Sequence, residues 1–451
     1  MENERSSFTG KLGFVLAAAG SAVGLGNIWR FPYLAAKYGG GIFLLVYLIL
    51  VVTFGFALMT AEISLGRKTG LSAIGAFGKL SRKYAFIGYI EAIVPMIILP
   101  YYCVIGGWVT KYFAIFASGG ALASASDGFF EAFIGRPAEP LGWFALYLGA
   151  TALVVWLGVE KGIERVSKIM MPILIVLSIA IAIYSVCLPG AVDGLRYYLL
   201  PDFKNFSVTT VLAAMGQMFY SMSLAMGIMI TYGSYMKKDV NLESSVRQIE
   251  IFDTGIAFLA GLMIVPAVFV FSGGDESALG KGPGLMFVTL PKVFESMRGG
   301  TFVGAMFFLL VLFAALTSSI SLMEAVVSII RDKFGVSRNK ACFWTIVISI
   351  ILGVPSSLGN GFWANIKIIG MDFLSFFDFM SNSVIMPIVA FFTCIFVGYV
   401  IKPKSIIEEV ESSAKFTGKG LFTVVIKYIA PVCIVLILIS SILEAMGILK
   451  I

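Results

Sequence analysis

The sequence predicts an all-α polytopic membrane protein of about eleven transmembrane helices, forming one transmembrane domain over residues 1–451. Two observations support this fold class. First, 59% of the 451 residues are hydrophobic and only 13% are charged, a balance that excludes an ordinary soluble globular domain. Second, windows of about 20 apolar residues, the length that crosses a bilayer as a helix, recur along the chain between short charged loops.

The predicted spans follow one another with short connections. Basic side chains gather in alternate loops, with roughly two-thirds of all Lys and Arg on the side of the N-terminus, so we expect a cytoplasmic N-terminus in a plasma (inner) membrane. The net charge of +7 reflects these loops, and we expect a lipid bilayer rather than a nucleic acid as partner. The spans cover residues 11–36, 41–66, 85–117, 142–159, 166–188, 208–235, 249–272, 301–331, 341–357, 368–400 and 420–446.

The first span is interrupted by residues that a continuous membrane helix does not need. Residues 20–33 contain three glycines, an asparagine, an arginine and a proline. Glycine lowers helix propensity by about 1 kcal/mol, and a charged side chain is costly inside a membrane. Non-helical backbone at that depth persists only where it is packed in protein or lines a cavity. The segment therefore predicts a broken helix whose free backbone groups bind ions or small polar molecules.

The sixth span repeats this interruption. Residues 217–227 are rich in small and hydroxyl side chains at the middle of the span. Broken spans five apart predict two five-span halves, and because five is odd the second half is inverted relative to the first. We expect the repeats at about residues 11–188 and 205–400, with an extra span at about 420–446.

The residue inventory argues against an enzyme. Histidine is absent and the five cysteines are scattered singly through apolar segments, so neither a disulfide framework nor a cysteine metal site is expected. No HExxH or GxSxG motif occurs.

These features resemble the neurotransmitter:sodium symporter family, in its short prokaryotic form. The motif Ala-Val-Gly-Leu-Gly-Asn-Ile-Trp-Arg-Phe-Pro at residues 22–32 carries most of the likeness, which covers the first ten spans. Further matching segments lie at residues 39–41, 216–220, 230–232 and 313–319. The resemblance implies the leucine-transporter fold and sodium-coupled symport of an amino acid by alternating access.

The resemblance also implies two sodium ions, which prefer oxygen ligands. Asp253 stands where relatives commonly have asparagine, and a fixed carboxylate there can replace a bound chloride, so we expect chloride not to be required. A structural role for Asp253 is the alternative. Hydroxyls of membrane helices also often bond only their own backbone. Sodium site one is expected at Ala22, Asn27, Ser221 and Asp253, and sodium site two at Gly20, Val23, Ala314, Thr317 and Ser318.

The expected substrate pocket adjoins both sodium sites. Tyr102 and the amides near Leu25 and Gly26 match groups that contact a substrate carboxylate in the family. Gly24 stands where amine-transporting relatives carry aspartate, which implies an amino acid. The mostly apolar lining favours a neutral hydrophobic or aromatic side chain. The expected pocket residues are Ala22, Gly24, Leu25, Gly26, Ile98, Tyr102, Tyr220, Ser221, Ser223, Met226, Ser318 and Leu322.

The resemblance assigns gates on both sides of the pocket. Arg30 and Asp378 match the outer pair, and Arg5 and Asp332 match the inner pair. Two acids inside spans, Glu62 and Glu324, are expected to satisfy exposed backbone of the broken sixth helix; proton carriage by one of them is the alternative.

Other functions remain open at this stage. Glycine, GABA or another carboxylate-bearing osmolyte is an alternative substrate, because Gly24 is compatible with any free carboxylate. A channel and a non-transporting sensor are alternatives of a different class. The oligomeric state is not indicated by the sequence.

Overall fold

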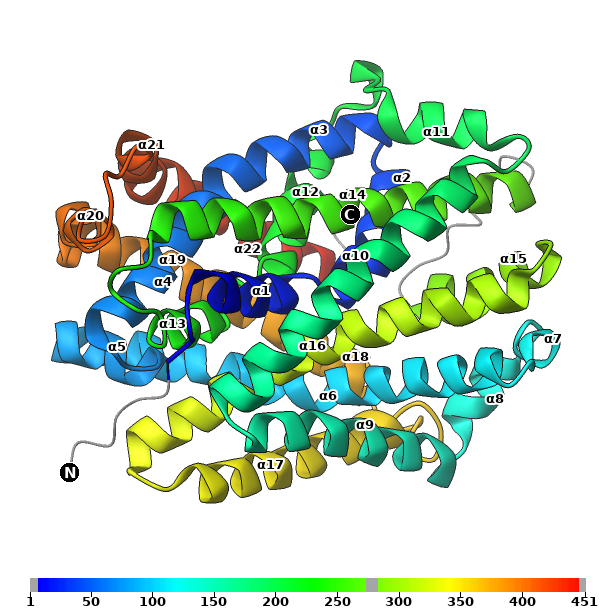
Figure 1. Cartoon of the computed structure of the whole chain (residues 1–451), viewed down its shortest axis with the longest axis horizontal. Coiled ribbons are helices and arrows are strands. Elements are labelled where there is room, and N and C mark those ends of the chain that lie inside the picture. The colour runs from blue at the N-terminus through cyan, green and yellow to red at the C-terminus, as the bar shows by residue number, and fades with distance from the viewer. Residues whose placement is uncertain (1–6, 273–282, 446–451) are drawn as a thin grey trace.

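The computed structural model describes residues 7–272 and 283–445, and in this part of the chain almost every element is a helix. The long helices pack beside one another as a bundle (Figure 1). No strand forms among the described residues; two isolated bridges join Gly40 to Pro201 and Ile368 to Met371. The predicted all-α class is therefore confirmed.

The helices of the first half run from residue 11 to residue 199. They are α1 (Lys11–Ala22), η1 (Gly26–Arg30), α2 (Phe31–Lys37), α3 (Gly41–Leu50), η2 (Val51–Gly55), α4 (Phe56–Thr69), α5 (Ala73–Leu80), η3 (Arg82–Tyr84), α6 (Ala85–Ala117), α7 (Ala121–Ser124), α8 (Phe129–Gly135), α9 (Ala138–Trp156), η4 (Val159–Glu164), α10 (Arg165–Val186) and α11 (Ala191–Leu199).

The remaining helices complete the bundle. They are η5 (Phe203–Asn205), α12 (Val208–Ser221), α13 (Ile228–Gly233), α14 (Leu242–Ser272), η7 (Leu285–Thr289), α15 (Leu290–Ser296), α16 (Gly300–Phe334), α17 (Arg338–Leu358), α18 (Phe373–Asp378), η8 (Phe379–Ile385), α19 (Met386–Ile395), η9 (Phe396–Val400), α20 (Lys402–Glu411), α21 (Lys419–Val424), η10 (Val425–Ile429) and α22 (Ala430–Ala445).

The count of membrane spans differs from the predicted eleven. Nine helical stretches among the described residues are long and apolar enough to cross a bilayer, and the first span makes ten when its bent halves are taken together. The predicted sixth span, α12 with α13, is not among them. Its longer half has 14 residues, about 21 Å of helix, which is shorter than the hydrocarbon core. The predicted break divides the sixth span into two short helices, and for this reason the count of eleven spans is not confirmed.

The outer surface suits a lipid environment. Large apolar side chains are exposed on the outside of several spans, including Leu153 of α9, Val176 of α10 and Ile351 of α17. In water such a surface would be unfavourable, whereas in a bilayer it contacts lipid chains. The chain is therefore a multi-pass membrane protein.

The first span is broken where the sequence predicts. α1 ends at Ala22, Val23 takes an extended conformation, and η1 begins at Gly26. The two halves meet at an angle of 53°. Pro32 lies in the first turn of α2, where a missing N–H costs no helical hydrogen bond.

The break in the sixth span lies between α12 and α13. Within it, Ser223, Ala225 and Gly227 have positive φ angles of 53°, 56° and 69°. This left-handed conformation is unfavourable for any residue but glycine, so contacts from neighbouring helices must hold the backbone here.

The two breaks lie against each other in the centre of the bundle (Figure 1). The Ser223 hydroxyl donates a hydrogen bond of 3.1 Å to the carbonyl of Ser21, and the two side-chain oxygens lie 3.2 Å apart. Every residue from Ile228 to Gly233 in α13 is buried. The irregular backbone is therefore enclosed by protein, as a membrane interior requires.

Candidate functional site

A cavity lies between the two breaks, against α6 and α16. About 330 Å³ of space lies between its lining atoms, part of it open to the surroundings. All twelve residues predicted for the substrate pocket line it, so the structure brings them together. Three further residues complete the lining, namely Ser21, Asn27 and Ile228. Ser21 and Ile228 were not predicted, and their only sequence signal is that each adjoins a glycine of its break, Gly20 or Gly227.

One corner of the cavity exposes groups that can bind a carboxylate. The backbone N–H of Leu25 donates a hydrogen bond of 3.2 Å to the hydroxyl of Tyr102 on α6. That N–H has no helical acceptor because the helix is interrupted, and the Tyr102 hydroxyl keeps its own hydrogen for donation. Gly24 leaves this corner open, because a Cβ there would lie 2.6 Å from the Ser318 hydroxyl and 3.0 Å from the Tyr102 hydroxyl.

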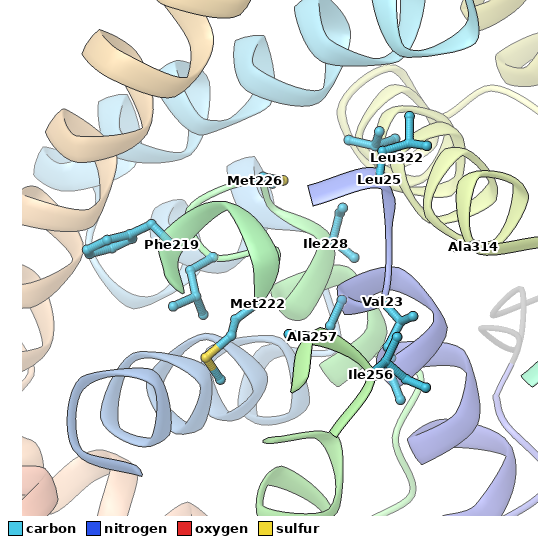
Figure 2. Packing of buried hydrophobic residues seen from close by; sticks show 14 of the residues in the cluster. Val23, Leu25, Phe219, Met222, Met226, Ile228, Ile256, Ala257, Ala314 and Leu322 are labelled. Atoms are coloured by element: carbon cyan, nitrogen blue, oxygen red, sulfur yellow. The ribbon is translucent and has the colours of Figure 1, made fainter. Parts of the chain in front are cut away.

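Part of the remaining lining is apolar, and serine hydroxyls, Asn27 and Tyr220 complete it. Ile98, Met226 and Leu322 contribute aliphatic or thioether surface. Figure 2 shows Leu25, Met226, Ile228 and Leu322 around the two breaks. None of the lining residues carries a formal charge, so the cavity offers no partner for an ionic side chain.

A cluster of oxygen atoms lies beside the cavity, centred on the buried carboxylate of Asp253. One carboxylate oxygen accepts hydrogen bonds of 2.7 Å from the Asn27 amide and from the Ser221 hydroxyl. The other accepts a bond of 3.2 Å from Tyr47. Ala22, the fourth residue predicted for this cluster, lines the cavity. Tyr47 was not predicted, because a tyrosine in an apolar span gives no signal that distinguishes it from ordinary core.

A second oxygen cluster joins α16 to the first break. The Ser318 hydroxyl lies 3.5, 3.0 and 3.4 Å from the carbonyl oxygens of Gly20, Ser21 and Val23. Thr317 faces Gly20, but its hydroxyl donates within its own helix, at 3.1 Å from the carbonyl of Ala314. The structure thus brings all five residues predicted for this cluster together, while the Thr317 hydroxyl points along α16.

Both oxygen clusters match the ligand chemistry of a hard monovalent cation. Carboxylate, carbonyl, amide and hydroxyl oxygens are the preferred donors of such ions. No Lys or Arg forms an ion pair with Asp253 in the described part of the chain. A cation at the first cluster would therefore balance a buried negative charge.

The predicted outer gate residues, Arg30 and Asp378, both lie against aromatic side chains. The guanidinium of Arg30 stacks over the Tyr220 ring at 5.5 Å. Asp378 accepts hydrogen bonds from Tyr101 at 3.1 Å and from Asn382 at 2.6 Å. Arg30 and Asp378 interact electrostatically without a direct ion pair between their described side chains.

Of the predicted inner gate pair, only Asp332 lies in the described part of the chain. Arg5 lies outside the described residues. Asp332 accepts hydrogen bonds from the backbone N–H and the hydroxyl of Ser72, at 2.7 and 2.6 Å.

The two acids predicted near the sixth-span break have different roles. Glu62 accepts a hydrogen bond of 2.7 Å from the N–H of Ala225, inside the break, as expected. Glu324 instead pairs with Arg338 and accepts a bond of 2.7 Å from Tyr235. The second acid at the break is Glu91 of α6, which the sequence reasoning missed.

The fold and this site define a class of protein: a multi-pass membrane protein that encloses a small-molecule cavity and cation-type oxygen clusters between two broken helices. The sequence model of the Sodium:neurotransmitter symporter family matches residues 5–122 and 134–448. The chain therefore belongs to this family, and it is a sodium-dependent transporter rather than an enzyme.

Individual relatives are similar to this chain over nearly its full length. An uncharacterized sodium-dependent transporter of Bacillus subtilis, YhdH, is 35% identical over 98% of both chains. Another, from Haemophilus influenzae, is 33% identical over 97% of this chain and 98% of that protein. The crystal structure of MhsT in complex with L-phenylalanine is similar with a TM-score of 0.88 and 40% identity, over 97% of this chain and all of that one.

Proposed function

We propose that this protein imports a neutral hydrophobic or aromatic amino acid together with two sodium ions, by alternating access. The observation that carries the proposal is the composition of the cavity. A carboxylate-binding corner at Leu25 and Tyr102 adjoins a lining without formal charge, in which Ile98, Met226 and Leu322 form an apolar part.

The cavity suits a zwitterion with an apolar side chain. The substrate carboxylate would accept hydrogen bonds from Tyr102 and from backbone amides of the break. The side chain would lie against Ile98, Met226 and Leu322. Met226 is flexible and polarizable, so it can adjust to large apolar groups. The bound phenylalanine named for MhsT supports this size and class of substrate.

Two sodium ions supply enough free energy for accumulation. One charge crossing 100 mV releases about 2.3 kcal/mol, and a tenfold gradient adds about 1.4 kcal/mol per ion. Two ions together therefore supply roughly 7 kcal/mol, enough to concentrate a zwitterion on the order of 10⁵-fold. The two oxygen clusters around Asp253 and Ser318 are the proposed ion sites, and the substrate carboxylate would complete the first.

The Asp253 carboxylate makes chloride unnecessary in this proposal. It supplies a fixed negative charge beside the first sodium, the role that a bound chloride would otherwise have. Arg30 with Asp378 would close the outer side of the pocket, with the Tyr220 ring as its lid. Arg5 with Asp332 would close the inner side, facing the cytoplasm, in a plasma membrane with the N-terminus inside.

The test is uptake of radiolabelled substrates into proteoliposomes that hold the purified full chain. An inward sodium gradient is compared with a matched potassium gradient, using leucine, phenylalanine, tryptophan, glycine and GABA. We expect saturable, sodium-dependent accumulation of the bulky neutral amino acids. Accumulation of glycine or GABA alone would overturn the side-chain assignment. A measured coupling of one sodium per substrate would exclude a second coupled ion, and non-saturable flux would indicate a channel.

A further inference from the structure

Two buried carboxyl groups hold the irregular backbone of the sixth span. Glu62 of α4 accepts a hydrogen bond of 2.7 Å from the N–H of Ala225, and Glu91 of α6 accepts one of 2.9 Å from the N–H of Gly227. Both acids are only 1% exposed. The amides are two residues apart in the chain, so two carboxyl groups from different helices meet at one short segment.

Each acid has one oxygen without a partner. Oε1 of Glu62 and of Glu91 receives an amide hydrogen, whereas Oε2 of each is buried without any hydrogen bond among the described residues. A carboxylate oxygen in the protein interior normally accepts at least one hydrogen bond. Two unsatisfied acceptors on acids that hold the same short segment point to a bound donor.

No protein cation fills that role in the described part of the chain. The charged groups of the surrounding helices are engaged elsewhere: Arg67 of α4 binds Glu409, Lys79 of α5 donates to the carbonyl of Thr69, and Glu324 of α16 pairs with Arg338. The thiol of Cys394 on α19 also lies within electrostatic range of Glu62. Glu62 and Glu91 lie close enough for their charges to repel each other.

Two carboxylates cannot both be ionised at such a site without a counter-charge, because burial and mutual repulsion oppose the second charge. Two oxygen atoms that lack partners are both satisfied by a single proton, which one carboxyl donates and the other accepts. We propose that Glu62 and Glu91 form a proton-binding site, in which the two buried carboxyl groups share one proton and so hold the break of the sixth span.

The proton site is connected to the cavity through the backbone. Met226 lies between the two amides that the acids hold, and it lines the cavity. Ala225 keeps an unfavourable positive φ of 56°, which its hydrogen bond to Glu62 stabilises. Loss of the shared proton would leave two repelling carboxylates beneath this segment. We therefore expect the conformation of Met226, and with it the shape of the pocket, to depend on the protonation of the pair.

The direct test is infrared spectroscopy of the purified full chain, in H₂O and in D₂O, at neutral pH. The wild type is compared with Glu62→Gln, Glu91→Gln and the double variant, with Glu408→Gln at an exposed position of α20 as the control. We expect the double variant to lose the signal of one protonated carboxylic acid and of one carboxylate. Each single variant should lose the same acid signal and keep a carboxylate, because the glutamine amide donates where the shared proton did.

Three outcomes would overturn the proposal. They are loss of two carboxylates from the double variant, loss of two protonated acids, and single variants that remove different acid signals. Size-exclusion chromatography checks that each variant is folded, and the single variants carry the test if the double variant does not fold. The measurement needs no substrate, so it stands apart from the proposed function.

A second measurement rests on the proposed function. Sodium-dependent phenylalanine binding should weaken at least threefold in the wild type at alkaline pH, and this loss should be absent in Glu91→Gln. The same loss in the variant would overturn the link between the proton site and the pocket. Absence of phenylalanine binding in the wild type at every pH would count against the proposed substrate, and the infrared result would still decide the proton site.

Discussion

The hydroxyl of Tyr102 accepts a hydrogen bond of 3.2 Å from the backbone N–H of Leu25, across the gap between α6 and the break of the first span. This contact satisfies an amide that the interrupted helix leaves without an acceptor. It also keeps the hydrogen of the phenol available for a further acceptor inside the cavity. A substrate carboxylate placed here would contact both groups at once.

Replacing Tyr102 with phenylalanine tests this contact. Tyr102→Phe removes the hydroxyl and keeps the ring. A hydrogen bond to a charged group contributes about 1.5–3 kcal/mol, so we expect about ten- to a hundredfold weaker binding of phenylalanine. The measurement is equilibrium binding of radiolabelled phenylalanine in sodium buffer. Tyr112→Phe is the matched control, because Tyr112 lies on the same helix and its hydroxyl donates to the carbonyl of Phe287. Equal losses in both variants would contradict a specific role of Tyr102.

Gly24 offers a test of the space in the same corner. A Cβ at this position would lie 2.6 Å from the Ser318 hydroxyl, closer than real Cβ contacts allow. We expect Gly24→Ala to shift Ser318 and to weaken both phenylalanine binding and sodium activation by about tenfold or more, in line with overpacking costs of about 1–3 kcal/mol. Gly216→Ala is the control, because a Cβ on that glycine of α12 meets nothing within 4 Å. The measurement is phenylalanine binding by both variants as a function of sodium concentration.

The fold class could be predicted because it depends on local chemistry, and the residues that line the cavity could be listed because the sequence resembles a known family. Glycines and polar residues inside an apolar span mark a break, and the motif at residues 22–32 places the surrounding side chains. Ser318 is an example: the resemblance groups it with Gly20 and Val23, and its hydroxyl lies beside both of their carbonyl oxygens.

Contacts between distant helices were harder to predict. Tyr47 and Glu91 lie in ordinary apolar spans, and only the packing of α3 and α6 against the breaks shows that they meet Asp253 and Gly227. Glu324 was expected at the sixth-span break because it is an acid inside a span. Its partner Arg338 lies on the next helix, and a sequence gives no direct measure of that distance.

The buried ion pair between Arg67 and Glu409 predicts a large effect on stability. Arg67 is fully buried, lies 2.9 Å from Glu409, and donates to the carbonyl of Val240 at 2.9 Å. Removing one partner of a buried pair typically costs about 3–5 kcal/mol. Because Lys238 also contacts Glu409 at 2.6 Å, we expect Arg67→Ala to destabilise the protein by about 3 kcal/mol, at the lower end of that range.

Thermal unfolding of the purified protein in detergent measures this loss as a lower Tm. Lys404→Ala is the control, because Lys404 and Glu408 form an exposed pair with a separation of 3.9 Å, and such pairs contribute little. A Tm for Arg67→Ala that equals the control value would show that the pair is not a structural link between α4 and α20.

Asp253 predicts how uptake responds to anions. Its carboxylate is buried and accepts hydrogen bonds from Asn27, Ser221 and Tyr47, so its negative charge is held in place beside the proposed first sodium. Replacing chloride with gluconate should therefore leave wild-type uptake unchanged.

Asp253→Asn removes the charge and keeps the shape. Opposite charges about 4 Å apart attract by about 4 kcal/mol near a protein surface, so the sodium concentration for half-maximal uptake should rise at least about tenfold in gluconate. Asp239→Asn, in an exposed loop, should behave as the wild type. A sharp fall of wild-type uptake in gluconate would mean that Asp253 does not replace a bound anion.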